Sequence, residues 1–196
     1  MLERTIRPAF QKVFVAPLVG LLLPLRLNPD VLTVAGGAAG VAAAPLLYFK
    51  LPWAALGALL LSGWLDTIDG SYARARGVSS EKGSALDIVS DRAVEFSVTL
   101  GLFLYAPGRG LECVVMLGSM LLCVTSFLVV GIFEKNSSQK SFHYSEGLME
   151  RAESFIFFGL MMLFPAYFSP LAWVFSALVF YTAAVRMYEF YFRRSV

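Results

Sequence analysis

Four aspartates stand within a short stretch of this otherwise apolar chain, as two pairs at helical spacing. Asp66 and Asp69 are three residues apart, and Asp87 and Asp91 are four residues apart. Residues at these separations project from one face of a helix. Two such faces turned together would repel strongly unless cations lay between the carboxylates. Because Mg²⁺ and Mn²⁺ take carboxylate oxygens as ligands, the spacing predicts a divalent-metal site formed by all four aspartates.

The segment between the two pairs has little side-chain bulk. Gly70 and Ala73 lie on the helical stripe of the first pair, and Gly83 lies four residues before Asp87 on the stripe of the second. Such small residues let a ligand approach the backbone. Arg74 adds a guanidinium, which binds phosphate oxygens in a bidentate way. This combination suits a nucleotide diphosphate that is bridged by metal.

Together, these residue types and spacings resemble the signature of the CDP-alcohol phosphotransferase family, also called the CDP-alcohol phosphatidyltransferase family. The matching positions are Asp66, Asp69, Gly70, Ala73, Arg74, Gly83, Asp87 and Asp91. Members of this family transfer a phosphatidyl group from a CDP-linked lipid to an alcohol hydroxyl and release CMP. The resemblance therefore implies CDP-diacylglycerol and a small alcohol as substrates, and a homodimer as the assembly.

The resemblance also implies a role for each part of the signature. Two divalent cations, Mg²⁺ or Mn²⁺, would be held by the aspartates and would stabilise the charge on the leaving CMP. Asp91, the last aspartate, is the expected general base for the acceptor hydroxyl. The expected CDP contacts are Asp66, Asp69, Gly70, Ala73, Arg74, Gly83 and Asp87.

The composition excludes an ordinary soluble domain. Of 196 residues, 58% are hydrophobic and 15% are charged, and the mean hydropathy is +0.69. These values predict an integral membrane protein, and the net charge of +2 is too small to indicate a nucleic-acid partner. Six apolar runs are close to the roughly 20 residues that cross a bilayer, so we expect an all-α fold with six transmembrane helices. The expected spans are 31–49, 52–76, 83–105, 111–133, 151–168 and 171–191.

Residues 1–27 are expected to form a separate N-terminal element ahead of a six-helix membrane domain at 28–196. The apolar run from Val13 to Leu25 contains Pro17 and Pro24 and ends without a small-residue cleavage site, which argues against a cleavable signal. An interfacial amphipathic helix is the preferred interpretation. A short first membrane span broken by proline is the alternative.

The distribution of basic residues predicts the orientation in the membrane. With six spans, both termini and the loops after spans two and four share one side. All of the 16 Lys and Arg residues except Lys50 and Arg109 fall on that side or on the adjoining span ends. Since basic residues gather on the cytoplasmic side, both termini and the aspartate motif are expected to face the cytoplasm.

The loop before the fifth span is the second polar cluster on the same side. Lys135, Lys140 and Arg151 could bind the phosphate of a phosphorylated polyol such as glycerol 3-phosphate or inositol phosphate. They could equally be ordinary positive-inside residues. The lysine-rich stretch that we associate with glycerophosphate-using relatives is absent here, which weakens that acceptor. His143, the only histidine, is expected to be a hydrogen-bonding loop residue rather than a ligand.

Three further features have structural interpretations. Arg92 and Glu95 are three residues apart and are expected to pair with each other on the helix. Cys113 and Cys123 lie ten apart in one apolar segment, so we expect buried free thiols. A small-residue face in the first span predicts close helix packing; it consists of Gly36, Gly37 and Gly40.

Two other classes of protein remain open at this point. A membrane prenyltransferase also binds metal and diphosphate through aspartate pairs on facing helices, and Asp87 and Asp91 alone would suit it. That hypothesis predicts a longer chain with more spans, and it leaves the glycines and Arg74 unexplained. A non-enzymatic cation carrier would need polar residues through the whole membrane depth, whereas those of this chain gather at one side.

Overall fold

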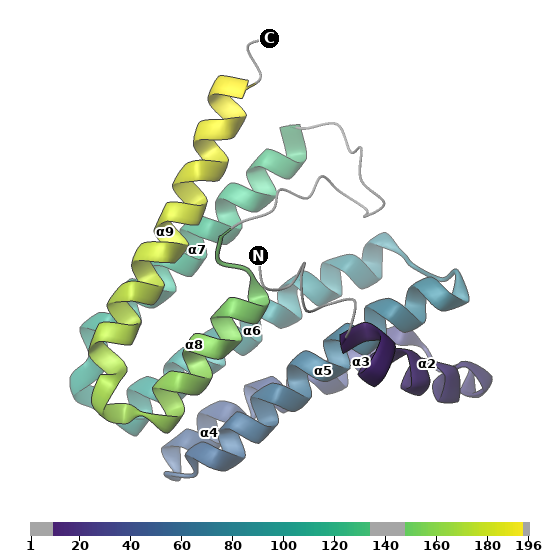
Figure 1. Ribbon diagram of the computed structural model, residues 1–196, viewed down its shortest axis with the longest axis horizontal. Helices are drawn as coiled ribbons and strands as arrows, with labels where there is room; N and C mark the ends of the chain where they lie inside the picture. Colours follow the sequence, from purple (N-terminus) through teal and green to yellow (C-terminus); the bar gives the residue numbers. More distant parts are fainter. Residues whose placement is uncertain (1–9, 134–147, 194–196) are drawn as a thin grey trace. The chain divides into compact units, whose positions relative to one another are not determined.

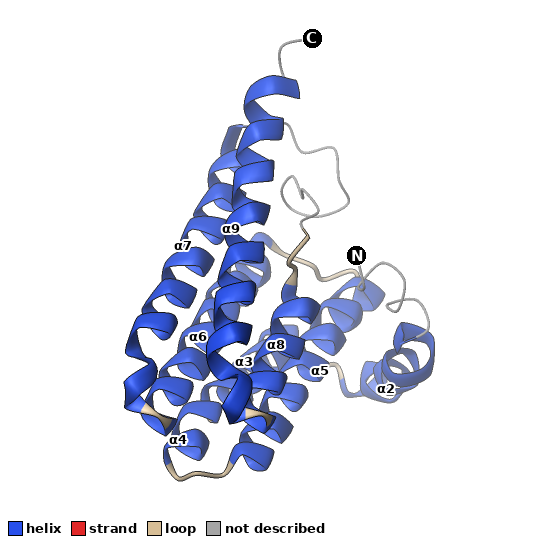
Figure 2. Cartoon of the chain, turned by 60° about the vertical axis from the view of Figure 1, so that its left-hand side comes forward, coloured by secondary structure: helices blue, strands red, loops and turns tan. Residues whose placement is uncertain are grey.

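The computed structural model describes residues 10–133 and 148–193, and no strand occurs among them (Figures 1 and 2). The predictions for Lys135, Lys140 and His143 lie outside the described residues. The chain divides into two compact units, one up to Pro107 and the other from Gly108 onward. The all-α prediction is confirmed for the described residues.

The first unit begins with a short helical segment. A π-helical turn, Gln11–Val15, leads into α2 (Ala16–Leu22) and a 3-10 turn, Leu23–Leu25. Pro17 and Pro24 both lie in first-turn positions, where a missing N–H costs no hydrogen bond. We call residues 10–25 the N-terminal segment.

The N-terminal segment has two apolar faces. Val15 and Val19 are buried together with Ile68 and Tyr72 of the following long helix. The other face exposes large apolar side chains, among them Val13, Phe14 and Leu21. The described part of the segment is therefore helical, but its outer face is apolar rather than polar over these positions, and the interfacial helix stays a prediction.

The first predicted span is helical but interrupted. It consists of α3 (Pro29–Val41) and α4 (Ala43–Tyr48), with Ala42 between them. Pro45 cannot donate a backbone hydrogen bond to the carbonyl of Val41, four residues earlier. Ser97 donates to that carbonyl instead, at 2.7 Å. The break at Ala42 thus has a local cause and a partner from another helix.

The two helices that carry the aspartates begin and end at clear local signals. α5 (Pro52–Arg76) has the predicted bounds and ends at Gly77, which is left-handed with φ of 65°. α6 (Glu81–Tyr105) begins after Ser80, whose Oγ accepts from the N–H of Gly83 at 3.0 Å.

α3 packs against both α5 and α6 (Figure 1). A Cβ added at Gly36 would lie 3.2 Å from Cβ of Leu65 on α5. A Cβ at Gly40 would lie 2.5 Å from Val94 on α6 and 2.7 Å from the hydroxyl of Ser62 on α5. The predicted close packing of this glycine face is therefore confirmed, and it brings α5 and α6 to neighbouring sides of α3.

The second unit contains α7 (Gly110–Phe133), α8 (Arg151–Leu163) and α9 (Phe168–Arg193). α9 packs against α7 and against α8. At one end of the unit, Arg109 donates to the carbonyl of Pro165 at 2.7 Å, and its guanidinium lies 4.4 Å from the ring centre of Phe168. These contacts fix the turn between α8 and α9 to the start of α7.

Three helical stretches have the length and apolar composition of membrane spans: Pro29–Tyr48, Pro107–Phe133 and Pro165–Phe192. The chain is accordingly an integral membrane protein. α5 and α6 have 25 residues each, which is about 38 Å of helix, but they carry the charged motif. α8 has 13 residues, about 20 Å, and is shorter than the roughly 30 Å hydrocarbon layer.

Candidate metal and nucleotide site

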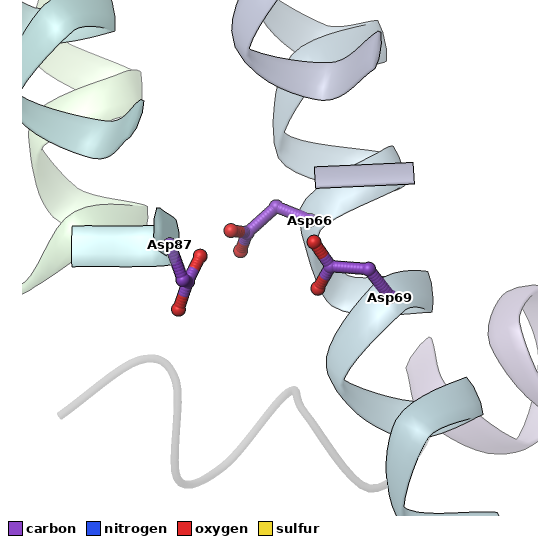
Figure 3. Close-up of side chains that lie close together, drawn as sticks. All are labelled: Asp66, Asp69 and Asp87. Atoms are coloured by element: carbon purple, nitrogen blue, oxygen red, sulfur yellow. The ribbon is translucent and has the colours of Figure 1, made fainter. Parts of the chain in front are cut away.

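Three of the four motif aspartates come together in the first unit. Asp66 and Asp69 project from α5 and Asp87 projects from α6, so that their carboxylates point toward one another (Figure 3). Each offers one oxygen, and these oxygens all lie within 4.8 Å of one another. Asp69 is buried, with 6% of its surface exposed, and the other two are half-buried. We call this group the aspartate triad.

The aspartate triad has the chemistry of a divalent-cation site. Oδ1 of Asp87 is buried and has no hydrogen-bond partner within the described chain. A buried carboxylate oxygen in that condition is costly unless a cation or a donor compensates it. Carboxylate oxygens at this separation are the donor set that Mg²⁺ and Mn²⁺ prefer. The residues therefore fit the predicted metal.

Asp91 is not a member of this close group. It follows Asp87 by one helical turn on α6 and is half-buried. Its expected roles, as a fourth metal ligand and as the general base, stay predictions.

The rotation of α5 about its own axis determines where Asp66 and Asp69 point. Ile68 and Tyr72, on another face of the same turns, are completely buried with the N-terminal segment. The hydroxyl of Tyr72 also donates to the carbonyl of Leu27 at 3.2 Å. Because one face of α5 is anchored in this way, its carboxylates are held toward α6.

The space beside Gly70 is occupied by the motif arginine. A Cβ added at Gly70 would lie 3.2 Å from Nη1 of Arg74. Arg74 is exposed, and its Nη2 donates to the hydroxyl of Ser71 at 3.2 Å. Gly70 is expected from the sequence to leave room for a ligand. In this structure, the room left by its missing side chain is taken by the guanidinium of Arg74. Ala73 is half-buried one residue before Arg74.

Gly83 lies in the first turn of α6, close to a carboxylate that the sequence did not single out. A Cβ at Gly83 would lie 3.5 Å from Oδ1 of Asp30, which is in the first turn of α3. Asn28 caps that turn by accepting from the N–H of Asp30 at 3.1 Å. The approach of Asp30 to Gly83 depends on how α3 packs on α6, so no local signal indicates it.

The remaining sequence predictions concern an ion pair, the two cysteines and Arg151. Arg92 and Glu95 form an ion pair at 2.8 Å, as predicted. Cys113 and Cys123 are both free, as predicted, but only Cys113 is buried; the prediction of burial is wrong for Cys123, which is half-buried. Arg151 is the first residue of α8 in the second unit, where its guanidinium lies 5.2 Å from the ring centre of Phe155.

The sequence interpretation missed one buried cation. Arg186 on α9 is 8% exposed and donates to the carbonyl of Cys123 at 3.0 Å and to the hydroxyl of Ser126 at 3.2 Å. Its guanidinium also lies 5.3 Å from the ring centre of Phe127. A charged residue inside an apolar helix is the available signal, and such residues commonly have functional roles in membrane proteins.

The chain is similar in sequence to known proteins over most of its length. The sequence model of the family described as CDP-alcohol phosphatidyltransferase matches residues 26–188. The inner membrane protein YnjF of Escherichia coli (strain K12) is 34% identical over an alignment of 203 positions, which covers 97% of this chain and 96% of that protein. A phosphatidylinositol phosphate synthase of Mycobacteroides abscessus is 31% identical over 191 residues, covering 93% of this chain and 85% of its own.

Solved structures share the fold. The crystal structure of Mycobacterium tuberculosis phosphatidylinositol phosphate synthase with CDP-DAG bound has a TM-score of 0.75 and 22% identity, and it covers 90% of this chain and 92% of its own. The same synthase in complex with manganese and citrate has a TM-score of 0.75 and 22% identity, with 90% and 88% covered.

Proposed function

Because the chain belongs to the CDP-alcohol phosphatidyltransferase family, we propose that it transfers the phosphatidyl group of CDP-diacylglycerol to an alcohol hydroxyl and releases CMP. The observation that carries this proposal is the aspartate triad, in which Asp66, Asp69 and Asp87 bring their oxygens within 4.8 Å across two helices. The related synthase that was crystallised with CDP-DAG supports the choice of donor.

The residues of the site have different proposed roles in the reaction. Divalent cations, Mg²⁺ or Mn²⁺, would neutralise the diphosphate and the charge on the leaving CMP when bound by the aspartates. Arg74 binds phosphate oxygens of the nucleotide, with Gly70, Ala73 and Gly83 keeping the surrounding helix faces free of bulk. Asp91 accepts the proton of the acceptor hydroxyl. The hydroxyl oxygen then forms its bond to the phosphatidyl phosphorus while the bond from that phosphorus to the CMP oxygen breaks.

The proposed acceptor is a phosphorylated polyol, with inositol phosphate ahead of glycerol 3-phosphate. The name of the relative from Mycobacteroides abscessus supports inositol phosphate. Arg151, together with Lys135 and Lys140, would contact the phosphate of the acceptor. Arg151 is described and half-buried at the start of α8.

We propose six membrane spans, a homodimer, and an active site and termini on the cytoplasmic side. The length of α5 and α6 supports two spans beyond the three apolar stretches, which makes five. The 13-residue α8 would be the sixth. The exposed apolar face of the N-terminal segment supports its placement at the membrane interface. The name of the Escherichia coli relative supports an inner-membrane location.

The proposal is tested by release of CMP from CDP-diacylglycerol by the purified protein. Reactions contain Mg²⁺ or Mn²⁺ and one of inositol phosphate, glycerol 3-phosphate, inositol or serine. We expect one acceptor to stimulate metal-dependent release, and Asp69→Asn to abolish it. Glu112→Gln, which removes a carboxylate in the second unit, is the control and should retain activity. A lack of metal-dependent CMP release with every acceptor would refute the proposed reaction and favour a different diphosphate donor.

A further inference from the structure

Ser71 on α5 connects the N-terminal segment to the motif arginine. Its hydroxyl donates to the carbonyl of Thr67 at 2.8 Å. It accepts from Nε2 of Gln11 at 3.2 Å and from Nη2 of Arg74 at 3.2 Å. A serine hydroxyl has one donor and two acceptor positions, so these three bonds use its full capacity. The position of the Ser71 oxygen is therefore closely determined.

The chain that follows Gln11 is anchored on α5 at two further points. Val15, one turn after Gln11, is completely buried together with Ile68 and Tyr72. Two residues past the end of the segment, the carbonyl of Leu27 accepts from Nη1 of Arg76 at 2.6 Å. Gln11 is thus presented to Ser71 by a segment that is packed and hydrogen-bonded to the same helix.

The hydrogen bond to Ser71 restricts the long side chain of Arg74. A free arginine loses considerable rotamer entropy when it is ordered on a ligand. A guanidinium that is already held loses less when it binds phosphate, which favours binding. Loss of the Gln11 donor would leave the Ser71 hydroxyl with an unused acceptor position. The position of the hydroxyl oxygen, and of the guanidinium bonded to it, would then be less restricted.

We propose that Gln11 is a positioning residue of the nucleotide site, which acts through the Ser71 hydroxyl to hold the Arg74 guanidinium ready for the CDP phosphates. The inference rests on the proposed function, because it requires Arg74 to contact the nucleotide. It also connects the N-terminal segment to the nucleotide site through Gln11 alone, although Gln11 is 60 residues away from Ser71 in sequence.

The test is Gln11→Met, which removes the donor and keeps a side chain of similar length. The matched control is Val13→Met, which introduces the same side chain at a position of the segment that is 60% exposed. We expect Gln11→Met to weaken Mn²⁺-dependent CDP binding by about two- to tenfold, the range for one net hydrogen bond. Binding is measured from the CDP concentration that gives half of the maximal thermal stabilisation. KM for CDP-diacylglycerol should rise by the same factor with kcat little changed, whereas the control should match wild type.

Arg74→Met, alone and combined with Gln11→Met, separates positioning from a general structural effect. If Gln11 acts through Arg74, the double variant binds CDP no more weakly than Arg74→Met. The inference would be overturned if Gln11→Met weakened CDP binding by the same factor in the Arg74→Met background as in wild type. Wild-type CDP affinity in Gln11→Met would also overturn it, and neither result would affect the proposed function. A wild-type protein that is not stabilised by CDP and Mn²⁺ would overturn both.

Discussion

Ser97 on α6 donates a hydrogen bond of 2.7 Å to the carbonyl of Val41 on α3, the carbonyl that Pro45 leaves without its usual helical donor. Ser97 is buried, with 5% of its surface exposed. One hydroxyl therefore compensates for a proline in a neighbouring helix and ties α6 to the point where α3 ends.

Ser97→Ala should destabilise the protein by about 1–3 kcal/mol, because it leaves the carbonyl of Val41 unsatisfied. The measurement is thermal or denaturant unfolding in detergent. Pro45→Ala restores a backbone donor to that carbonyl, so the cost of Ser97→Ala should become smaller in the Pro45→Ala background. An equal cost in both backgrounds would show that Ser97 stabilises the helices by another means.

Gly40→Ala should lower stability by about 1–3 kcal/mol through overpacking. Its Cβ would lie 2.5 Å from Val94, so either the Val94 side chain or the packing of α3 on α6 must shift. Because α3 positions both aspartate helices, the affinity for Mn²⁺ should fall as well. Gly57→Ala on α5 is the control, since a Cβ there meets nothing within 4 Å. Alanine is the better helix former by up to about 1 kcal/mol, so this control should be neutral or stabilising.

Gly70→Ala should raise KM for CDP-diacylglycerol without lowering stability. The new Cβ would lie 3.2 Å from Nη1 of Arg74, and the exposed end of that side chain moves at little cost. Steady-state kinetics and an unfolding midpoint for the same preparation provide the comparison. Gly118→Ala, in α7, places a Cβ in open space and should leave KM unchanged. A wild-type KM in Gly70→Ala would mean that the position of the guanidinium does not limit nucleotide binding.

Much of the first unit follows from local signals. The bounds of α5 are predictable because Pro52 begins it and Gly77 ends it, and Ser80 caps α6. The spacing of Asp66 and Asp69 places them on one face without further information. These features depend only on residues within a few positions of one another.

The remaining features depend on contacts between segments far apart in sequence. Apolar patterning predicts a continuous first span, because it does not register that Pro45 leaves a carbonyl for Ser97 to satisfy. Hydropathy likewise treats the last span as uniformly apolar and overlooks Arg186, whose partners lie on α7. The bond from Gln11 to Ser71 requires the N-terminal segment to dock on α5, which no sequence spacing indicates.

The separation of Asp91 from the aspartate triad leads to the last prediction. Asp87→Asn removes a triad member, so its affinity for Mn²⁺ should fall by more than the roughly 10- to 100-fold that changes outside a ligand shell cost. Asp91→Asn should instead lower kcat by about 10²- to 10⁴-fold and change Mn²⁺ affinity little. Calorimetric titration with Mn²⁺ measures the metal affinity of both variants, and CMP release by the same samples measures kcat. The two measurements together distinguish a metal ligand from a general base. Loss of Mn²⁺ affinity in Asp91→Asn equal to that in Asp87→Asn would assign Asp91 to the metal rather than to the acceptor proton.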